Sequence, residues 1–246
     1  MELFFHKPTQ SSPGEQKGLD LQAQNLGYTL RRYYIDLFHL NHIPALRPGS
    51  VVLDLGGNKI RKRGQFDLEK YNLCVVYSNL STVKSPDVQA DAAYIPFADN
   101  SFDVVICSEL LEHVPNPPEV LSEVYRVLRP GGLLLICVPF LYQIHGDPYD
   151  FGRYTDYYWS FILKKIGYKD VFIEKQGLFW SVLVGTLTAW LYELNQEKPF
   201  RFHKAVIGLV ARAKRLAVKW DADAYHLNHP FFSSFTTGFG IRARKG

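Results

Sequence analysis

Residues 139–155 hold the densest group of side chains able to do acid–base chemistry. Six titratable side chains fall within ten positions there: His145, Asp147, Tyr149, Asp150, Arg153 and Tyr154. A histidine has the ordinary pKa best suited to a general base near neutrality, so His145 is the expected base. Arg153 can clamp an anionic group, and with Tyr149 these two are the candidate catalytic residues. A competing, structural interpretation pairs Asp150 with Arg153 to fix the shape of a lid.

The elements that position this segment are apolar runs alternating with helical patterns. Strands are expected at VVLDL (51–55), LCVVY (73–77), FDVVICS (102–108), LLLICVP (133–139), 168–175 and 235–245. A helical pattern at 120–128 stops at Arg129-Pro130-Gly131-Gly132, where proline and glycine end a helix. Strands that alternate with helices predict a parallel sheet, and the loops that follow its strands meet at its carboxyl edge.

Composition limits the classes of protein to which the chain can belong. The 246 residues, 47% hydrophobic and 21% charged, suit one globular domain preceded by a helix over 19–40. Cys74, Cys107 and Cys137 each lie in an apolar run and are expected to be buried thiols of a cytoplasmic protein. The N-terminal apolar run is too short for a signal peptide. A net charge of +4 is too small to indicate nucleic-acid binding by itself.

The first strand ends in Asp54, followed by Gly56 and Gly57. This places a carboxylate at the carboxyl edge of the sheet, beside a backbone that a ligand can approach closely because it lacks Cβ atoms. The dinucleotide fingerprint GxGxxG is absent. Taken alone, the pattern is common to many parallel α/β proteins.

Two longer stretches narrow this choice. QADAAYIPFADNSFDVVICSELLEHV (89–114) and EVYRVLRPGGLLLICVP (123–139) follow in an order and spacing that resembles the class I S-adenosylmethionine-dependent methyltransferases, in particular the type 11-like group acting on small molecules and saccharides. The resemblance covers about residues 45–175 and returns at the last strand. It implies a Rossmann-like seven-stranded sheet, mostly parallel with the last strand antiparallel, and direct in-line methyl transfer without a covalent enzyme intermediate.

The resemblance also implies a cofactor site. Asp54 and the two glycines would hold the methionine end of S-adenosylmethionine, and Asp91 would accept a hydrogen bond from the adenine amino group. Asn79 stands where an acidic residue usually meets the ribose hydroxyls, and its amide oxygen can still accept one such bond. The cofactor residues implied in this way are Asp54, Gly56, Gly57, Asn79, Asp91, Ala92, Ser108 and Glu109.

Two departures from the family pattern support an alternative function. Asn58 and Ile60 replace glycines of the first loop, although asparagine tolerates a left-handed backbone better than other non-glycine residues. Asn79 replaces the usual acid. The chain is alternatively an inactive binding or scaffold protein with the same fold, in which Asp54 and Asp91 only cap turns.

Glu109, Glu112 and His113 have the ExxEH spacing with which some methyltransferases hold a divalent metal near the acceptor hydroxyl. A cation there would lower the pKa of a bound oxygen. The same string is common in relatives without a metal, where the first glutamate borders the methionine moiety. We therefore expect no metal, and name these three residues as the candidates if one binds.

Some sixty residues separate Glu174 from Phe235, more than the fold needs, which predicts a helical insertion over 176–234. Its first part, 177–194, is almost wholly apolar but short for a membrane span. Its second part, 204–220, places the basic residues Lys204, Arg212, Arg215 and Lys219 in one sector, opposite Val206, Leu209, Val210, Leu216 and Trp220. The insertion is interpreted as a cap over the acceptor site, as peripheral contact of 177–220 with the inner face of a membrane, or as a homodimer contact.

These observations predict one domain, with a helical lead-in (1–45), a cofactor-binding core (46–175), the insertion (176–234) and a final strand (235–246). The expected acceptor is a small molecule, a saccharide or a lipid-linked compound. An RNA methyltransferase, suggested by a pI of 8.8 and the basic run at 59–63, is disfavoured because no RNA-binding domain and no Asn-Pro-Pro-Tyr motif are present.

Overall fold

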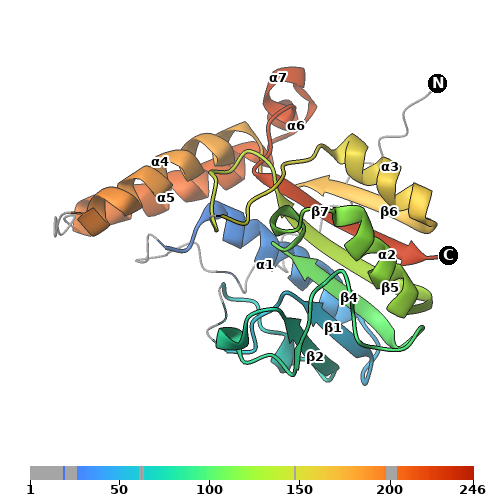
Figure 1. Cartoon of the computed structure of the whole chain (residues 1–246). Helices are drawn as coiled ribbons and strands as arrows, with labels where there is room; N and C mark the ends of the chain where they lie inside the picture. The colour runs from blue at the N-terminus through green and yellow to red at the C-terminus, as the bar shows by residue number, and fades with distance from the viewer. Residues whose placement is uncertain (1–18, 20–26, 61, 63, 147, 198–203) are drawn as a thin grey trace.

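A single sheet forms the centre of the computed structural model, which describes residues 19, 27–60, 62, 64–146, 148–197 and 204–246. Within these residues seven strands lie in the order β3-β2-β1-β4-β5-β7-β6 (Figure 1). Their bounds are β1 Val51–Leu55, β2 Cys74–Asn79, β3 Val88–Gln89, β4 Phe102–Ser108, β5 Leu128–Pro139, β6 Tyr168–Lys175 and β7 Gly238–Lys245. The strand β3 has only two residues, and the sequence did not locate it.

Strand directions confirm the expected fold class. Neighbouring strands pair in parallel from β3 through β5, whereas β7 runs antiparallel to both β5 and β6. The chain leaves β1 toward β2 on one side and continues later at β4 on the other, so the strand order reverses between β1 and β4. Such a switch point opens a crevice at the carboxyl ends of parallel strands, where α/β proteins bind ligands.

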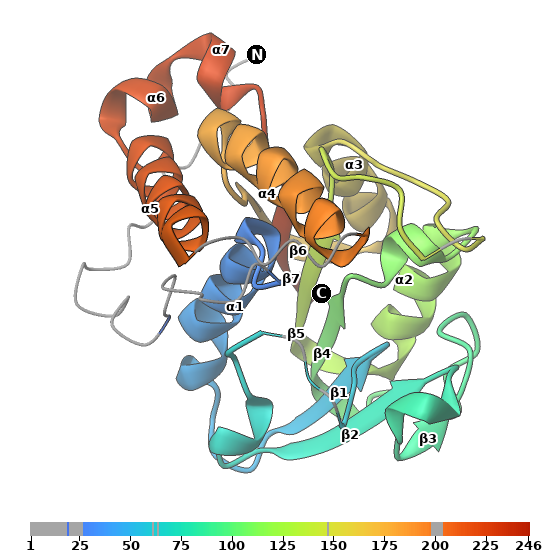
Figure 2. The ribbon, with the colours of Figure 1, turned by 90° about the vertical axis from the view of Figure 1, so that its left-hand side faces the viewer.

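Helices cover both faces of the sheet (Figures 1 and 2). On one face α2 (Pro117–Val127) and α3 (Asp156–Ile166) bury Val124 and Trp159 against the sheet. On the other face α1 (Leu30–His42) buries Ile35 and Phe38. Successive side chains of β4 point to opposite faces of the sheet. Val105 and Cys107 therefore pack on the side of α2, and Val104 and Ile106 pack on the side of α1. Short 3₁₀ turns occupy Ile43–Ala45, Leu68–Lys70, Thr82–Lys84 and Leu111–His113.

The helix α1 begins later than the apolar periodicity predicts. Gly27 to Thr29 are not helical, and the Thr29 hydroxyl caps the helix by accepting a hydrogen bond from the Arg32 N–H at 3.1 Å. A side chain that satisfies a free N–H in this way defines a helix start. Residues 20–26 of the predicted helix, like the segment 8–18, lie outside the described residues.

One cysteine differs from the prediction. Cys107 and Cys137 are buried in β4 and β5, but Cys74 is exposed. Cys74 is the first residue of β2, and only the later residues Tyr77 and Ser78 of that strand are fully covered. An apolar run therefore identified the strand but not which of its ends is buried.

Among the residues described between β6 and β7, four helices are found: α4 (Phe179–Glu197), α5 (Lys204–Asp221), α6 (Ala224–Asn228) and α7 (Pro230–Ser233). The first two run side by side and project from the sheet as a helical arm (Figures 1 and 2). The carboxylate of Asp221 joins them, because it accepts the N–H groups of Leu178, Trp180 and Ser181 at 2.8–3.0 Å. These are free donors at the start of α4.

The buried face of α5 coincides only in part with the predicted apolar face. Val210 of that face is buried, but Leu209 is 67% exposed, and Lys214, Ala217 and Asp221 make up the rest of the buried side. Lys214 donates to the carbonyl oxygen of Tyr28 at 2.8 Å, and burial lowers the pKa of Lys214 to about 8. Which face of α5 is buried is thus decided by hydrogen bonds of Asp221 to the start of α4 and of Lys214 to Tyr28, and not by side-chain hydrophobicity.

The arm exposes apolar side chains on both of its helices, namely Leu183, Leu187, Trp190, Leu209, Leu216 and Trp220. No helix within the described part of the chain is long and apolar enough to cross a membrane. Contact of 177–220 with a membrane surface and a homodimer contact both stay predictions.

Replacing Asp221 by alanine is expected to lower the free energy of unfolding by about 2 kcal/mol or more, because three buried N–H groups lose a charged acceptor. Urea unfolding followed by circular dichroism measures this loss. The matched control is Asp223→Ala, which removes the exposed cap of α6 and is expected to have an effect of about 1 kcal/mol or less. Equal losses in the two variants would contradict the proposed anchoring of the arm.

Candidate functional site

A cavity of about 490 Å³ opens at the carboxyl edge of the sheet, around the ends of β1, β2 and β4. All of the residues that the resemblance assigns to the cofactor line it: Asp54, Gly56, Gly57, Asn79, Asp91, Ala92, Ser108 and Glu109. They come from segments up to 55 positions apart, which only the folded sheet brings together. The volume lies within the usual range of small-molecule sites.

The glycine loop after β1 can be built only with glycine at two positions. Gly56 has φ +80°, and a Cβ there would lie 2.9 Å from the Leu110 side chain. At Gly57 a Cβ would overlap the carboxylate of Asp54. Asn58 is not among the described residues with positive φ, so the left-handed backbone considered for it is absent. Its replacement of glycine therefore introduces no backbone strain.

Asn79 holds this loop in place. Its amide nitrogen donates to the carbonyl oxygens of Gly56 and Gly57 at 2.8 and 3.0 Å, and its amide oxygen accepts the Ser81 N–H at 2.9 Å. A carboxylate has no hydrogen to donate and cannot make the first two contacts. The asparagine is thus a structural requirement of this loop, and the departure from the family pattern has a physical reason.

Asp54 is half-buried at the wall of the cavity. Burial raises the pKa of its carboxyl to about 7, with the positive charge of Lys62 acting in the opposite direction. Lys62 itself donates to Asp67 at 2.7 Å and to the Tyr77 hydroxyl at 3.2 Å. A bound cation would favour the ionised form of such a carboxyl.

The segment after β3 supplies the cavity with one exposed polar side chain and with apolar residues that anchor the segment in the core. Asp91 is exposed, and one of its oxygens accepts the Ala93 N–H at 2.9 Å. This matches the turn-cap interpretation, and a carboxylate keeps further lone pairs for an adenine amino group. Ala92 and Ile95 are buried in the core, where they fix the segment below the cavity.

The helix α1 contributes cavity residues that the sequence reading missed. His39 lines the cavity, and its Nε2 lies 2.9 Å from the Ser108 hydroxyl. Burial lowers the pKa of His39 to about 3, so the ring is neutral. Arg32 and Asp36 also line the cavity. Their one signal in the sequence is a row of polar residues on an otherwise apolar helix.

Glu109 is bound by a buried arginine. Arg31, 3% exposed, donates to Glu109 Oε1 from Nη2 at 2.6 Å and from Nε at 3.2 Å. Its Nη1 donates to Gln176 Oε1 at 2.5 Å. Glu109 has a left-handed backbone, with φ 53°. The Arg31 contact orients the residue that borders the expected methionine position.

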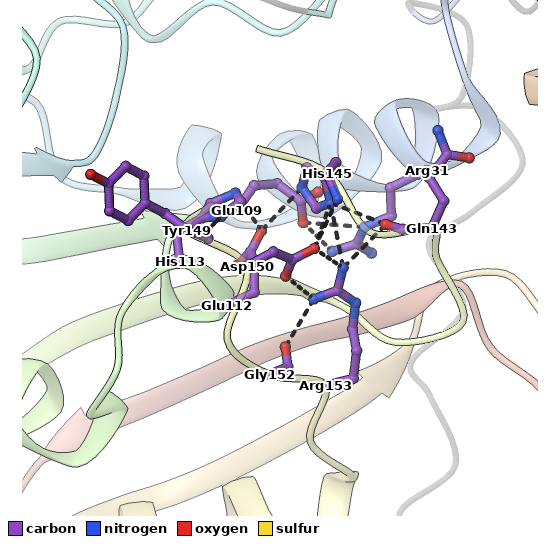
Figure 3. Close-up of polar contacts among 10 residues, drawn as sticks. All are labelled: Arg31, Glu109, Glu112, His113, Gln143, His145, Tyr149, Asp150, Gly152 and Arg153. Carbon is purple, nitrogen blue, oxygen red and sulfur yellow. Dashed lines mark hydrogen bonds and ion pairs between the residues drawn. The ribbon is translucent and has the colours of Figure 1, made fainter. Parts of the chain in front are cut away.

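The segment 140–155, here termed the lid loop, follows β5. Arg153 grips Asp150 through two bonds of 2.5 and 2.7 Å, and the His145 N–H donates to Asp150 Oδ2 at 2.9 Å (Figure 3). Arg153 holds the pKa of Asp150 at about 2. The guanidinium is thus engaged within the loop, as the structural interpretation expects, while Tyr149 reaches the cavity wall. Asp147 lies outside the described residues.

Below the lid loop, Glu112 meets two histidines (Figure 3). Its carboxylate Oε1 lies 3.6 Å from His113 Nε2 and 3.8 Å from His145 Nε2. The side chain is 1% exposed, and burial, followed by the negative charge of Glu109, raises its pKa. The Phe151 N–H donates to the Glu112 backbone oxygen at 2.8 Å, which fastens the loop to this turn.

Residues 61–136 match the model of a family described as a methyltransferase domain. This span begins just after the glycine loop and ends within β5, and the sheet order and antiparallel β7 are those implied by the resemblance. Residues 61–136 are thus similar to a methyltransferase domain, and the chain has the class I methyltransferase fold. The cofactor used by this family is S-adenosylmethionine.

Curated relatives of the methyltransferase domain act on small molecules according to their names. The ubiquinone/menaquinone biosynthesis C-methyltransferase of Legionella pneumophila (strain Corby) is 31% identical over 134 residues, which are 48% of this chain and 51% of that protein. Phosphoethanolamine N-methyltransferase 2 of Caenorhabditis elegans is 27% identical over 133 residues, 48% of this chain and 29% of that protein. The chain spans about half the length, or less, of these relatives.

Solved structures share the fold of the methyltransferase domain. Phosphoethanolamine N-methyltransferase 2 of Haemonchus contortus, in complex with phosphomonomethylethanolamine and S-adenosylhomocysteine, has a TM-score of 0.54 at 18% identity, covering 86% of this chain and 52% of that one. The [4+2]-cyclase SpnF has a TM-score of 0.52 at 21% identity, covering 87% and 80%. A cyclase among the neighbours shows that the fold alone does not fix the reaction.

Asn79→Asp restores the acid that the family pattern favours, yet we expect it to weaken the protein. Two carbonyl oxygens of the glycine loop lose their donor and face a carboxylate, which lowers the free energy of unfolding by about 1–3 kcal/mol. Urea unfolding measures the change. Asn72→Asp, at an exposed turn before β2, is the control and is expected within about 0.5 kcal/mol of the unsubstituted protein. Unchanged stability in Asn79→Asp would refute the clamp.

Proposed function

We propose that the chain is an S-adenosylmethionine-dependent methyltransferase that acts on a small-molecule acceptor by direct in-line transfer. The observation that supports this most is the gathering of all eight implied cofactor residues around one 490 Å³ cavity. When bound, the cofactor supplies an electrophilic methyl group on a sulfonium. The protein has to hold the acceptor in line with that group and, where the acceptor carries a proton, to assist its removal.

The residues of the cavity fit this cofactor. A Cβ at Gly56 or Gly57 would collide with Leu110 or Asp54, so glycine lets the loop pack closely against both side chains at the cavity wall. Asp54 offers a carboxylate to the cofactor's ammonium group, and Asp91 offers one to the adenine amino group. Asn79 acts through the glycine loop, since its amide already donates to two carbonyl oxygens there.

The acceptor would lie between this cavity and the lid loop. Tyr149 and His113 line the cavity on that side. We keep His145 as the expected base and Tyr149 as an acceptor contact, with Arg153 acting on Asp150 to shape the loop. Among small molecules, a saccharide or lipid-linked acceptor stays within the proposal, and the helical arm offers apolar surface for the latter.

Calorimetric titration of S-adenosylmethionine and S-adenosylhomocysteine tests the proposal. We expect micromolar binding to the unsubstituted protein and binding weaker by about tenfold in Asp91→Ala, the loss of one hydrogen bond. Asp99→Ala removes an exposed carboxylate outside the cavity and serves as the matched control. If neither compound binds the unsubstituted protein, the chain is an inactive scaffold with a methyltransferase fold.

Cofactor affinity is expected to fall as the pH drops below about 7. The pKa of Asp54 in the free protein is raised to about 7, and a bound ammonium lowers it, so binding below this pH must displace a proton. The association constant then decreases by up to about tenfold per pH unit and is flat above pH 7. Titrations between pH 5.5 and 8.5 measure the slope. Asp54→Asn should bind more weakly with no such slope, and an equal slope in both proteins would assign the effect to another group.

A further inference from the structure

Glu112 is a buried carboxylate whose negative charge is not balanced by the arginines around it. Neither of its oxygens has a hydrogen-bond partner among the described residues. The two nearest arginines are already engaged, Arg31 with Glu109 and Arg153 with Asp150. Counting these pairs as neutral leaves one negative charge at Glu112 in a site shielded from water. A buried charge of this kind requires a cation or a proton.

Two histidines turn their Nε2 atoms toward this carboxylate. His113 Nδ1 lies 2.5 Å from the backbone oxygen of Tyr149, which can only accept, so Nδ1 carries the hydrogen. His145 Nδ1 lies 3.2 Å from the Gln143 backbone oxygen and 3.5 Å from Asp150 Oδ2. We assign the hydrogen to Nδ1 there as well, although Arg153 Nη2 also lies within 3.4 Å. With this hydrogen on Nδ1, the nitrogen left to coordinate a metal ion is Nε2, which faces Glu112 in both rings.

We propose that Glu112, His113 and His145 form a binding site for a divalent transition-metal ion. One carboxylate oxygen and two imidazole nitrogens lie within 4.8 Å of one another. The 3.6 and 3.8 Å separations from Glu112 are a few tenths of an ångström wider than the spacing of about 3.3 Å around a tetrahedral zinc ion. Small side-chain movements close this difference.

The groups next to these three side chains are those usually found beside metal ligands in proteins. Metal-bound histidines commonly donate their other ring N–H to a backbone carbonyl or a carboxylate, which fixes the ring. Here Tyr149 and Gln143 provide the carbonyls, and Asp150 lies beside the second ring. Two imidazoles and one carboxylate favour Zn²⁺ and similar ions over Mg²⁺ or Ca²⁺, which prefer oxygen ligands. Glu109 is not in the set, because Arg31 binds it.

The site has a role that rests on the proposed function. His113 lines the cofactor cavity, so an ion bound here lies at its border, with coordination positions left for an acceptor oxygen or water. A bound cation lowers the pKa of such an oxygen and makes it a better nucleophile toward a methyl group. His145 then acts as a metal ligand and not as a free base.

The test uses untagged full-length protein freed of metal with a chelator. Zn²⁺ is titrated calorimetrically, and Co²⁺ is added separately so that its visible absorption reports nitrogen and oxygen coordination. We expect one Zn²⁺ per chain with a dissociation constant of about a micromolar or below, Mg²⁺ far weaker, and an increase in melting temperature on binding. Glu112→Gln, similar in size but uncharged, should weaken Zn²⁺ binding by about a hundredfold, and His145→Ala by at least about tenfold.

The control variant is His226→Ala, which removes a histidine paired with Asp223 at 3.4 Å on the inserted helices and should leave the affinity unchanged. Equal Zn²⁺ affinity in the unsubstituted protein, Glu112→Gln and His145→Ala would overturn the site and leave a proton on Glu112. If Glu112→Gln does not fold, His145→Ala decides, because its side chain lies on the lid loop and is 27% exposed.

Cofactor titration of the same samples separates the two proposals. Zn²⁺ bound by these ligands without binding of S-adenosylmethionine would retain the metal site and reject the proposed function. Cofactor binding without a Zn²⁺ site that depends on Glu112 and His145 would retain the proposed function and reject the metal site.

Discussion

The buried guanidinium of Arg31 is the constraint on which the arrangement around the cavity depends. It donates to Glu109 at the end of β4 and to Gln176 before α4, so one side chain of α1 connects the core to the helical arm. The space it occupies exists because residue 238 of β7 is glycine, where a Cβ would overlap the guanidinium. Removing one member of a buried ion pair leaves a charge without a partner and is strongly destabilising. Glu109 keeps its left-handed backbone, and its place at the cavity, because this contact compensates for the strain.

The sequence predicted most of the sheet and the part of the cavity wall that the ends of its strands supply, because both depend on local patterns. Apolar runs marked β1, β4 and β6 to the residue. The predicted start of β5 at residue 133 is wrong, because β5 already begins at Leu128 and the Pro130-Gly131-Gly132 stretch lies within it, at a break in its pairing with β4. Asp54 lies near the end of β1 and Asp91 lies two residues after β3, and parallel strands end at one edge. Their meeting around a cavity therefore follows from topology once the strands are recognised.

What the sequence could not provide is contact between distant side chains. Ser108 meets His39 across 69 positions, and no local pattern indicates that pairing. The role of Asn79 was sought at the ribose, whereas its amide holds backbone 22 and 23 positions earlier. On α5 the periodicity correctly indicated a helix, but Lys214 and Asp221 are buried because their partners lie on other segments. Hydrophobic pattern alone favours a neighbouring face there, which shares only Val210 with the buried one.

The position of β7 also bears on how the chain is made. The strand β6 pairs in the sheet only through β7, and β7 lies between it and β5. A ribosome that has completed β5 must still synthesise the lid loop, β6 and the four inserted helices before residues 238–245 appear. Until then one edge of β5 has no partner, and the apolar side chains of β6 have no sheet to pack against. Unpaired edges of this kind favour aggregation. The final assembly of the sheet is therefore a late step, and β5 and β6 are the segments of the nascent chain that are exposed until it occurs.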